Sequence, residues 1–122
     1  MANKKIVLAI DDNIQQLNEF KTILIKNYDL RVVKSASEAI NFLNKNNADI
    51  ILLDIEMPDI SGFEFLDDIK KVPSHADVPV IIISGNNGQE FFKRAGESEA
   101  AGVLTKPVNA DRLTEAIEKA VF

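Results

Sequence analysis

The chain has 122 residues, no cysteine, a formal net charge of −5 and a pI near 4.8. An apolar content of 46% and a charged content of 27% are typical of one globular domain. The net charge is negative and the basic residues are scattered along the chain. Nucleic-acid binding requires clustered Lys and Arg, so this composition argues against it. No apolar run approaches the roughly 20 residues of a membrane span. We therefore expect a single cytoplasmic domain over residues 1–122, with no nucleic-acid partner and no membrane insertion.

Five short apolar runs are predicted to be strands. They are rich in Val, Ile and Leu without alternation, which is typical of parallel strands buried on both faces. The runs cover residues 6–10, 30–33, 50–53, 78–83 and 103–104. The second run contains Arg31 and is the least apolar of the longer ones. We therefore expect it at an edge of the sheet.

A segment of helical period follows each strand. The first runs from about Ile14 to Lys26, the second opens with a capping box at Ser35 and Glu38, and the others follow Gly62, Gly88 and Asn109. Five strand–helix units predict an α/β fold, a doubly wound (βα)5 parallel sheet with helices on both faces. The expected strand order is 2-1-3-4-5, which reverses between the first and third strands, where such sheets bind ligands.

Polar side chains stand at the carboxyl ends of four of these strands. Asp11 and Asp12 follow the first strand, Asp54 the third, Ser84 the fourth, and Lys106 comes shortly after the fifth. Parallel strands end at one edge of a sheet, so we expect these groups to converge there. Three carboxylates, a hydroxyl and an ammonium suit a divalent metal and a phosphoryl group.

The charges at this edge argue for a cation. Either acidic motif alone could simply begin a helix, because carboxylates are favourable at helix N-termini. Together the carboxylates repel, at roughly 4 kcal/mol for a pair about 4 Å apart in an effective dielectric near 20. Lys106 supplies one positive charge against three negative ones, so a hard divalent cation such as Mg²⁺ is predicted. Pro107 restricts the backbone of Lys106 to extended conformations.

Two further groups of residues lie outside this edge. His75 lies in the polar segment 73–77, without a second histidine or any cysteine in the chain, so we interpret it as solvated surface. Phe91 and Phe92 are interpreted as core and as partner-facing surface, respectively.

The motifs at the strand ends are similar to those of a known family. They are the acidic pair Asp11-Asp12, the segment 54–63 with Pro58 and Gly62, Ser84-Gly85 and Lys106-Pro107. In this order and spacing they resemble the receiver domain of two-component response regulators, to which chemotaxis regulators also belong. The resemblance spans the chain from Ile6 to Val121 and implies the flavodoxin-like version of the fold.

The resemblance also implies roles for individual residues. Asp54 would accept a phosphoryl group from the phosphohistidine of a sensor histidine kinase or histidine phosphotransfer protein. Asp12, Asp54 and the backbone carbonyl of Glu56 would bind Mg²⁺ or Mn²⁺, with Asp11 acting mainly through water. Ser84 and Lys106 would contact the phosphoryl group, and the Lys106–Pro107 bond would be cis.

The family resemblance further implies a switch. The chain would catalyse only its own phosphorylation and autodephosphorylation. Phosphorylation would alter the surface of the fourth helix, fifth strand and fifth helix, and thereby binding to a downstream protein target. Val103 stands where the family usually has an aromatic switch residue, and Glu56 and Asn86 stand where it tunes the phosphate lifetime.

Two alternatives remain open from the sequence. A degenerate receiver would bind a partner without phosphorylation, and Val103 leaves room for it. An aspartate-based phosphatase would need an acid two residues after its nucleophile, a spacing that Glu56 satisfies. The chain shows no substrate-cap segment, which argues against a phosphatase.

Overall fold

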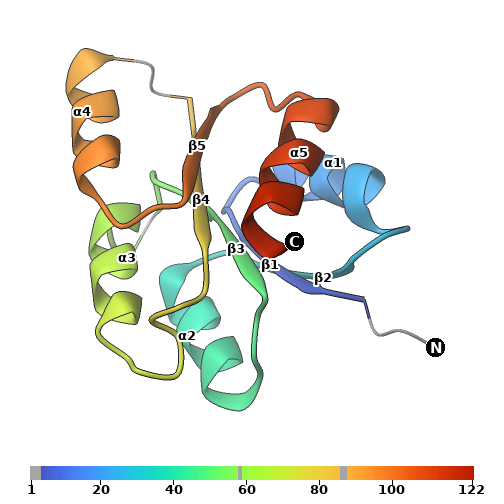
Figure 1. The fold of residues 1–122 in the computed structure, drawn as a ribbon, viewed down its shortest axis with the longest axis horizontal. Coiled ribbons are helices and arrows are strands. Elements are labelled where there is room, and N and C mark those ends of the chain that lie inside the picture. Colours follow the sequence, from blue (N-terminus) through green and yellow to red (C-terminus); the bar gives the residue numbers. More distant parts are fainter. Residues whose placement is uncertain (1–3, 58, 86–87) are drawn as a thin grey trace.

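The computed structural model describes residues 4–57, 59–85 and 88–122, in which strands and helices alternate as predicted (Figure 1). The strands are β1 (Ile6–Ile10), β2 (Asp29–Val33), β3 (Ile50–Asp54), β4 (Val80–Ser84) and β5 (Gly102–Thr105). The helices are α1 (Ile14–Leu24), α2 (Ala36–Lys45), α3 (Gly62–Lys70), α4 (Gln89–Glu97) and α5 (Ala110–Val121). Within the described residues, no helix is long and apolar enough to cross a membrane.

The strands form one parallel sheet in the order β2-β1-β3-β4-β5. The predicted fold class and strand order are therefore confirmed, and β2, with its Arg31, lies at an edge. Ile10 pairs with Leu53 in register, so β1 and β3 end side by side. The reversal of strand order falls between these two strands, as expected.

Helices cover both faces of the sheet. In Figure 1, α1 and α5 lie on one side, and α2, α3 and α4 lie on the other. Successive residues of a strand point to opposite faces, so each strand contributes to two hydrophobic cores. Leu8 and Ile10 pack in the core with Phe65, whereas Val7 and Ala9 pack in the core beneath α1 and α5. Continuous apolar strands follow from this double burial.

The ends of two strands differ from the prediction in a way that matters for the site. Asp54 and Ser84 are the last residues of β3 and β4 and do not follow them. Asp54 pairs in register with Ile83, and Ser84 pairs with Thr105. Both polar side chains are therefore held by sheet backbone, which fixes their direction better than a loop would.

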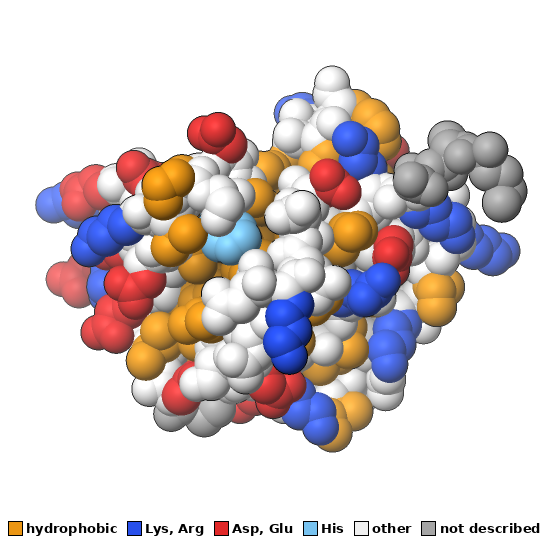
Figure 2. All heavy atoms as spheres, turned by 90° about the horizontal axis from the view of Figure 1, so that it is seen from below, with side chains coloured by type: hydrophobic (Ala, Val, Ile, Leu, Met, Phe, Trp, Pro, Cys, Tyr) orange, Lys and Arg blue, Asp and Glu red, His pale blue; other side chains and the backbone are white. Residues whose placement is uncertain are grey.

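The interpretation of His75 as solvated surface is wrong. Its side chain is only 8% exposed and lines a cavity of about 140 Å³ together with Leu43, Ile69 and Val72. Figure 2 shows the pale blue side chain of the single histidine among orange hydrophobic ones. The polar segment turns at Val72, whose carbonyl accepts from the His75 amide at 2.9 Å, and it places His75 against residues of α2 and α3.

Gly62, at the start of α3, packs closely against the backbone at the end of β3, and this contact leads to the first prediction. A Cβ added there would lie 2.7 Å from the Cα of Ile55 and 2.9 Å from the carbonyl oxygen of Asp54. We expect Gly62→Ala to lower the free energy of unfolding by about 1–3 kcal/mol, because the backbone of Asp54 and Ile55 must move to make room for the methyl group. Urea denaturation measures this change.

Gly96 provides the matched control. It is the next-to-last residue of α4, and an added Cβ would meet nothing within 4 Å. Gly96→Ala should raise the free energy of unfolding by about 0.5–1 kcal/mol, because alanine favours helix. Equal effects of the two substitutions would contradict the close approach at Gly62.

Candidate functional site

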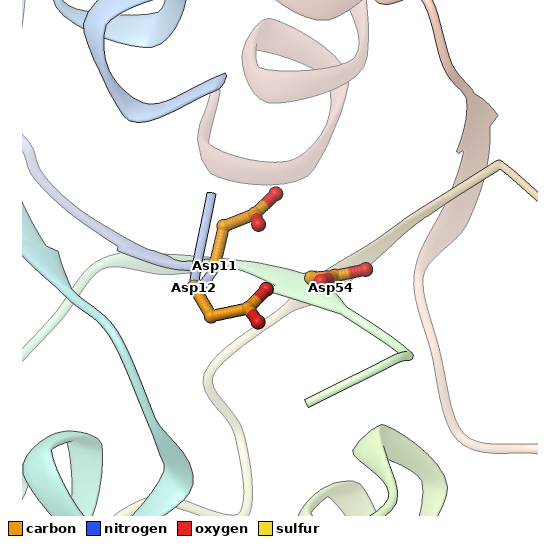
Figure 3. A group of neighbouring side chains, drawn as sticks. All are labelled: Asp11, Asp12 and Asp54. Atoms are coloured by element: carbon orange, nitrogen blue, oxygen red, sulfur yellow. The ribbon is translucent and has the colours of Figure 1, made fainter. Parts of the chain in front are cut away.

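Three carboxylates meet at the carboxyl edge of the sheet. Asp11 and Asp12 follow β1, Asp54 ends β3, and Figure 3 shows their side chains leaving these neighbouring strand ends. One oxygen from each carboxylate can be chosen such that all three lie within 4.8 Å of one another. Asp11 and Asp54 are buried, at 1% and 5% exposed, whereas Asp12 is exposed. The sheet therefore assembles the acidic cluster that the sequence predicts.

Both carboxylate oxygens of Asp11 have partners within the protein. Oδ1 accepts a hydrogen bond from the Asn13 amide at 2.9 Å, at the N-cap of α1. Oδ2 accepts one from the Lys106 ammonium at 2.9 Å. Asp11 thus joins the start of α1 to the segment after β5, and its oxygens are already used in these contacts.

Lys106 places its ammonium between two buried carboxylates. Its Nζ lies 2.9 Å from Asp11 Oδ2 and 3.7 Å from Asp54 Oδ1. Its backbone amide donates to the Ser84 carbonyl at 2.8 Å, and the Lys106–Pro107 bond is cis, as expected. Burial lowers the pKa of Lys106, but the hydrogen bond with Asp11 and the charge of Asp54 outweigh it and raise the pKa overall. The lysine therefore stays charged.

Asp54 is a carboxyl group whose charge is disfavoured. Burial, followed by the charge of Asp11, raises its pKa to about 6 from an ordinary value of 3.8. Lys106 and a hydrogen bond from the Glu56 amide at 3.3 Å oppose this rise without cancelling it. One ammonium does not offset the neighbouring carboxylates, so the site attracts a further cation.

The donor atoms fit a hard divalent cation. Mg²⁺ binds oxygen ligands at about 2.0–2.1 Å, so two direct ligands of one ion lie within roughly 4.2 Å of each other. Three oxygens within 4.8 Å of one another are compatible with a site in which two carboxylates bind directly and the third acts through water. Asp11 is the natural choice for the indirect role, because Asn13 and Lys106 already occupy its oxygens.

The remaining residues of the expected site lie around this cluster. Ser84 is fully buried at the end of β4, beside the backbone of Lys106. Glu56 is exposed and lines a pocket of about 330 Å³ with Phe63 and Arg94. Val103 is partly buried against the core that contains Phe91. Asn86 lies outside the described residues.

Two contacts near the site leave no signal in the sequence. The Asp59 carboxylate accepts hydrogen bonds from the amides of Ala36 and Ser37 at the start of α2, at 3.3 and 3.0 Å. The Arg94 guanidinium lies 4.3 Å from the centre of the Phe63 ring. Both contacts join residues far apart in the chain, and no local spacing signals them.

Comparison with known proteins identifies the family. A family model described as the response regulator receiver domain matches residues 7–118. The chain belongs to this family. It is thus a receiver domain of two-component signalling, and receiver domains bind Mg²⁺ through acidic residues such as those clustered here.

Individual relatives agree with this assignment. The receiver is 34% identical over 93 residues to the luminescence regulatory protein LuxO of Vibrio campbellii, covering 76% of the chain and 20% of LuxO. It is 31% identical over 104 residues to the two-component response regulator ORR12 of Oryza sativa, covering 84% of the chain and 86% of ORR12. The chain therefore spans only a fifth of LuxO.

A solved structure is similar over the whole fold. A CheY-like response regulator receiver domain protein from Methanospirillum hungatei is 26% identical, with a TM-score of 0.88. The match covers 98% of this chain and 94% of that one.

The raised pKa of Asp54 leads to the second prediction, on the metal-free receiver. Between about pH 4 and pH 6, folded Asp54 keeps a proton that the unfolded chain has lost, so the free energy of unfolding falls as pH rises. Asp54→Asn should remove this pH-dependent fall in the free energy of unfolding. At pH 7 the variant should therefore be more stable than wild type by roughly 2 kcal/mol. The difference should vanish near pH 4. Urea denaturation at several pH values measures it.

Asp67→Asn is the control, because Asp67 is exposed on α3 and outside the cluster. It should keep the pH profile of wild type. An Asp54→Asn profile parallel to that of wild type would show that the Asp54 carboxyl is not destabilised by its surroundings.

Proposed function

We propose that this receiver is a Mg²⁺-dependent phosphoacceptor of a cytoplasmic two-component pathway, with the phosphoryl group carried on Asp54. The observation that carries the proposal is the Lys106 ammonium, held 2.9 Å from Asp11 and 3.7 Å from Asp54. This arrangement leaves a buried carboxylate at the sheet edge with a cationic group beside it. The proposal treats residues 1–122 as a single receiver domain.

The chemistry at Asp54 is the transfer of one phosphoryl group. A carboxylate oxygen of Asp54 attacks the phosphorus of a phosphohistidine on a histidine kinase or histidine phosphotransfer protein. The new phosphorus–oxygen bond forms as the phosphorus–nitrogen bond breaks, and its electron pair returns to the imidazole. Attack of water on the acyl phosphate then releases inorganic phosphate and restores the carboxylate. Beyond these two reactions on itself, the chain would catalyse nothing.

Each neighbouring group has a part in this transfer. Mg²⁺, held by Asp12, Asp54 and the Glu56 carbonyl, would neutralise negative charge that builds on the phosphoryl oxygens. The Lys106 ammonium would neutralise part of the same charge. Asp11 keeps the ammonium in place through its 2.9 Å hydrogen bond. The Ser84 hydroxyl would contact a phosphoryl oxygen, and Glu56 and Asn86 would tune the lifetime of the product.

The proposed output is a change of the surface formed by α4, β5 and α5. Val103 on β5 packs against the core that holds Phe91 of α4, whose ring lies 5.4 Å from that of Phe92. Phe92 is 45% exposed and available to a downstream protein target. Valine is short and stiff at χ1, so α4 itself would carry most of the change.

The third prediction tests the acceptor. Incubation with acetyl phosphate and Mg²⁺ should add the mass of one phosphoryl group to the wild-type protein, as intact-mass spectrometry measures. Asp54→Asn should remain unmodified, because an amide oxygen does not form the acyl phosphate. Removal of Mg²⁺ should slow the reaction by more than about tenfold.

The outcomes separate the competing functions. Modification of Asp54→Asn at the wild-type rate would place the acceptor elsewhere. A wild-type protein that is never modified would indicate a receiver that binds partners without phosphorylation. Steady release of phosphate without accumulation of the modified species would indicate a phosphatase. The exposed-site variant Asp67→Asn should react as wild type does.

A further inference from the structure

The connection between β3 and α3 carries a proposed metal ligand, so its position matters to the site. Glu56 lies in this connection, directly after Ile55, and its backbone carbonyl would contact Mg²⁺. Near the site, the Glu56 amide donates to Asp54 Oδ1 at 3.3 Å, and the Gly62 amide donates to the Ile55 carbonyl at 2.9 Å. The bond from Gly62 to Ile55 joins the two ends of the connection, whereas the bond from Glu56 to Asp54 is local. Neither bond involves Asp59.

Asp59 ties this connection to a different part of the protein. Its Oδ2 accepts from the Ser37 amide and the Ser37 hydroxyl, each at 3.0 Å, and its Oδ1 accepts from the Ala36 amide at 3.3 Å. The contact bridges 22 to 23 residues of sequence. A carboxylate at a helix N-terminus is favoured both by the free amides and by the helix dipole.

The start of α2 does not depend on Asp59 alone. The Ser35 hydroxyl accepts from the Glu38 amide at 3.1 Å, and Glu38 Oε1 accepts from the Lys34 amide at 3.3 Å. The Ser35 cap is the one that the sequence predicts, but Glu38 accepts from the amide of Lys34 and not, as a complete capping box requires, from that of Ser35. Since α2 has its own cap, the three bonds to Asp59 add a link between α2 and the connection that carries Glu56.

We propose that Asp59 is a positioning residue for the metal site, holding the β3–α3 connection so that the Glu56 carbonyl is in place before Mg²⁺ arrives. The inference rests on the proposed function of the Asp54 site. A ligand that is already in position spares the ion the cost of ordering it. Asp59 therefore raises the affinity for Mg²⁺ without touching the ion or the phosphoryl group.

Calorimetric titration with Mg²⁺ tests this role in variants of the 122-residue chain. Asp59→Ala should weaken Mg²⁺ binding at least about fivefold. Asp59→Asn should bind with intermediate affinity, because its amide oxygen can still accept from the start of α2. Ser35→Ala is the matched control: it removes a hydrogen bond from the same helix N-terminus without touching the connection. It should bind Mg²⁺ within about twofold of wild type.

Two further measurements separate positioning from general loosening. In metal-free protein, hydrogen exchange of the Gly62 amide should be at least about tenfold faster in Asp59→Ala than in Ser35→Ala. At saturating Mg²⁺, Asp59→Ala should react with acetyl phosphate within about threefold of the wild-type rate, because the chemical groups are intact. A rate loss that excess Mg²⁺ does not restore would overturn the inference.

Other results would overturn it equally. Asp59→Ala with wild-type Mg²⁺ affinity would show that the contact with α2 does not position Glu56. Ser35→Ala with an equal loss of affinity would assign the effect to the helix. A wild-type protein that binds Mg²⁺ in an Asp59-dependent way but gains no phosphoryl group would contradict the proposed function and support this inference.

Discussion

The site depends on the contact between one ammonium and two buried carboxylates. Lys106 lies 2.9 Å from Asp11 and 3.7 Å from Asp54, and both aspartates are almost fully removed from solvent. Removing Lys106 would leave both buried carboxylates without their cation, which is strongly destabilising, whereas Lys106 keeps Asp11 as a partner when the charge of Asp54 is removed. With Asp12 included, three carboxylates face one ammonium, so the pairing stabilises the site without neutralising it. The remaining negative charge is the physical reason for the proposed metal.

The sheet is what makes this contact possible. Parallel strands that are buried on both faces end at a common edge, which brings polar side chains at their ends close together. Asp54 and Ser84 end β3 and β4, while Lys106 follows β5 and donates its amide to the Ser84 carbonyl at 2.8 Å. Residues distant in sequence are thus held by backbone hydrogen bonds and not by flexible loops. The same rigidity leaves the metal-free carboxylates little freedom to move apart.

The features that could be predicted are those that the pattern of apolar residues along the chain determines. The apolar strands, the strand order and the convergence of Asp11, Asp12 and Asp54 could be predicted, because burial on both faces leaves a clear signal in the sequence. The burial of His75 and the contact of Asp59 with α2 could not. Both depend on how a connection folds across a neighbouring helix, and polar connections resemble solvated loops in sequence. The bounds of β1 agree with the prediction, but several ends of the other strands differ from it by one or two residues, because hydrogen bonding and not hydrophobicity decides where a strand ends.

The central claim is that a divalent cation completes the charge balance at the sheet edge, and thermal unfolding with and without Mg²⁺ tests it most directly. A ligand that binds the folded state raises the melting temperature, by the equivalent of about 2.7 kcal/mol at a hundred times its dissociation constant. The account predicts a clear rise in wild type, a larger rise in Lys106→Met, which loses the internal cation, and a smaller one in Asp54→Asn. Equal melting temperatures with and without saturating Mg²⁺ in all three proteins would contradict it.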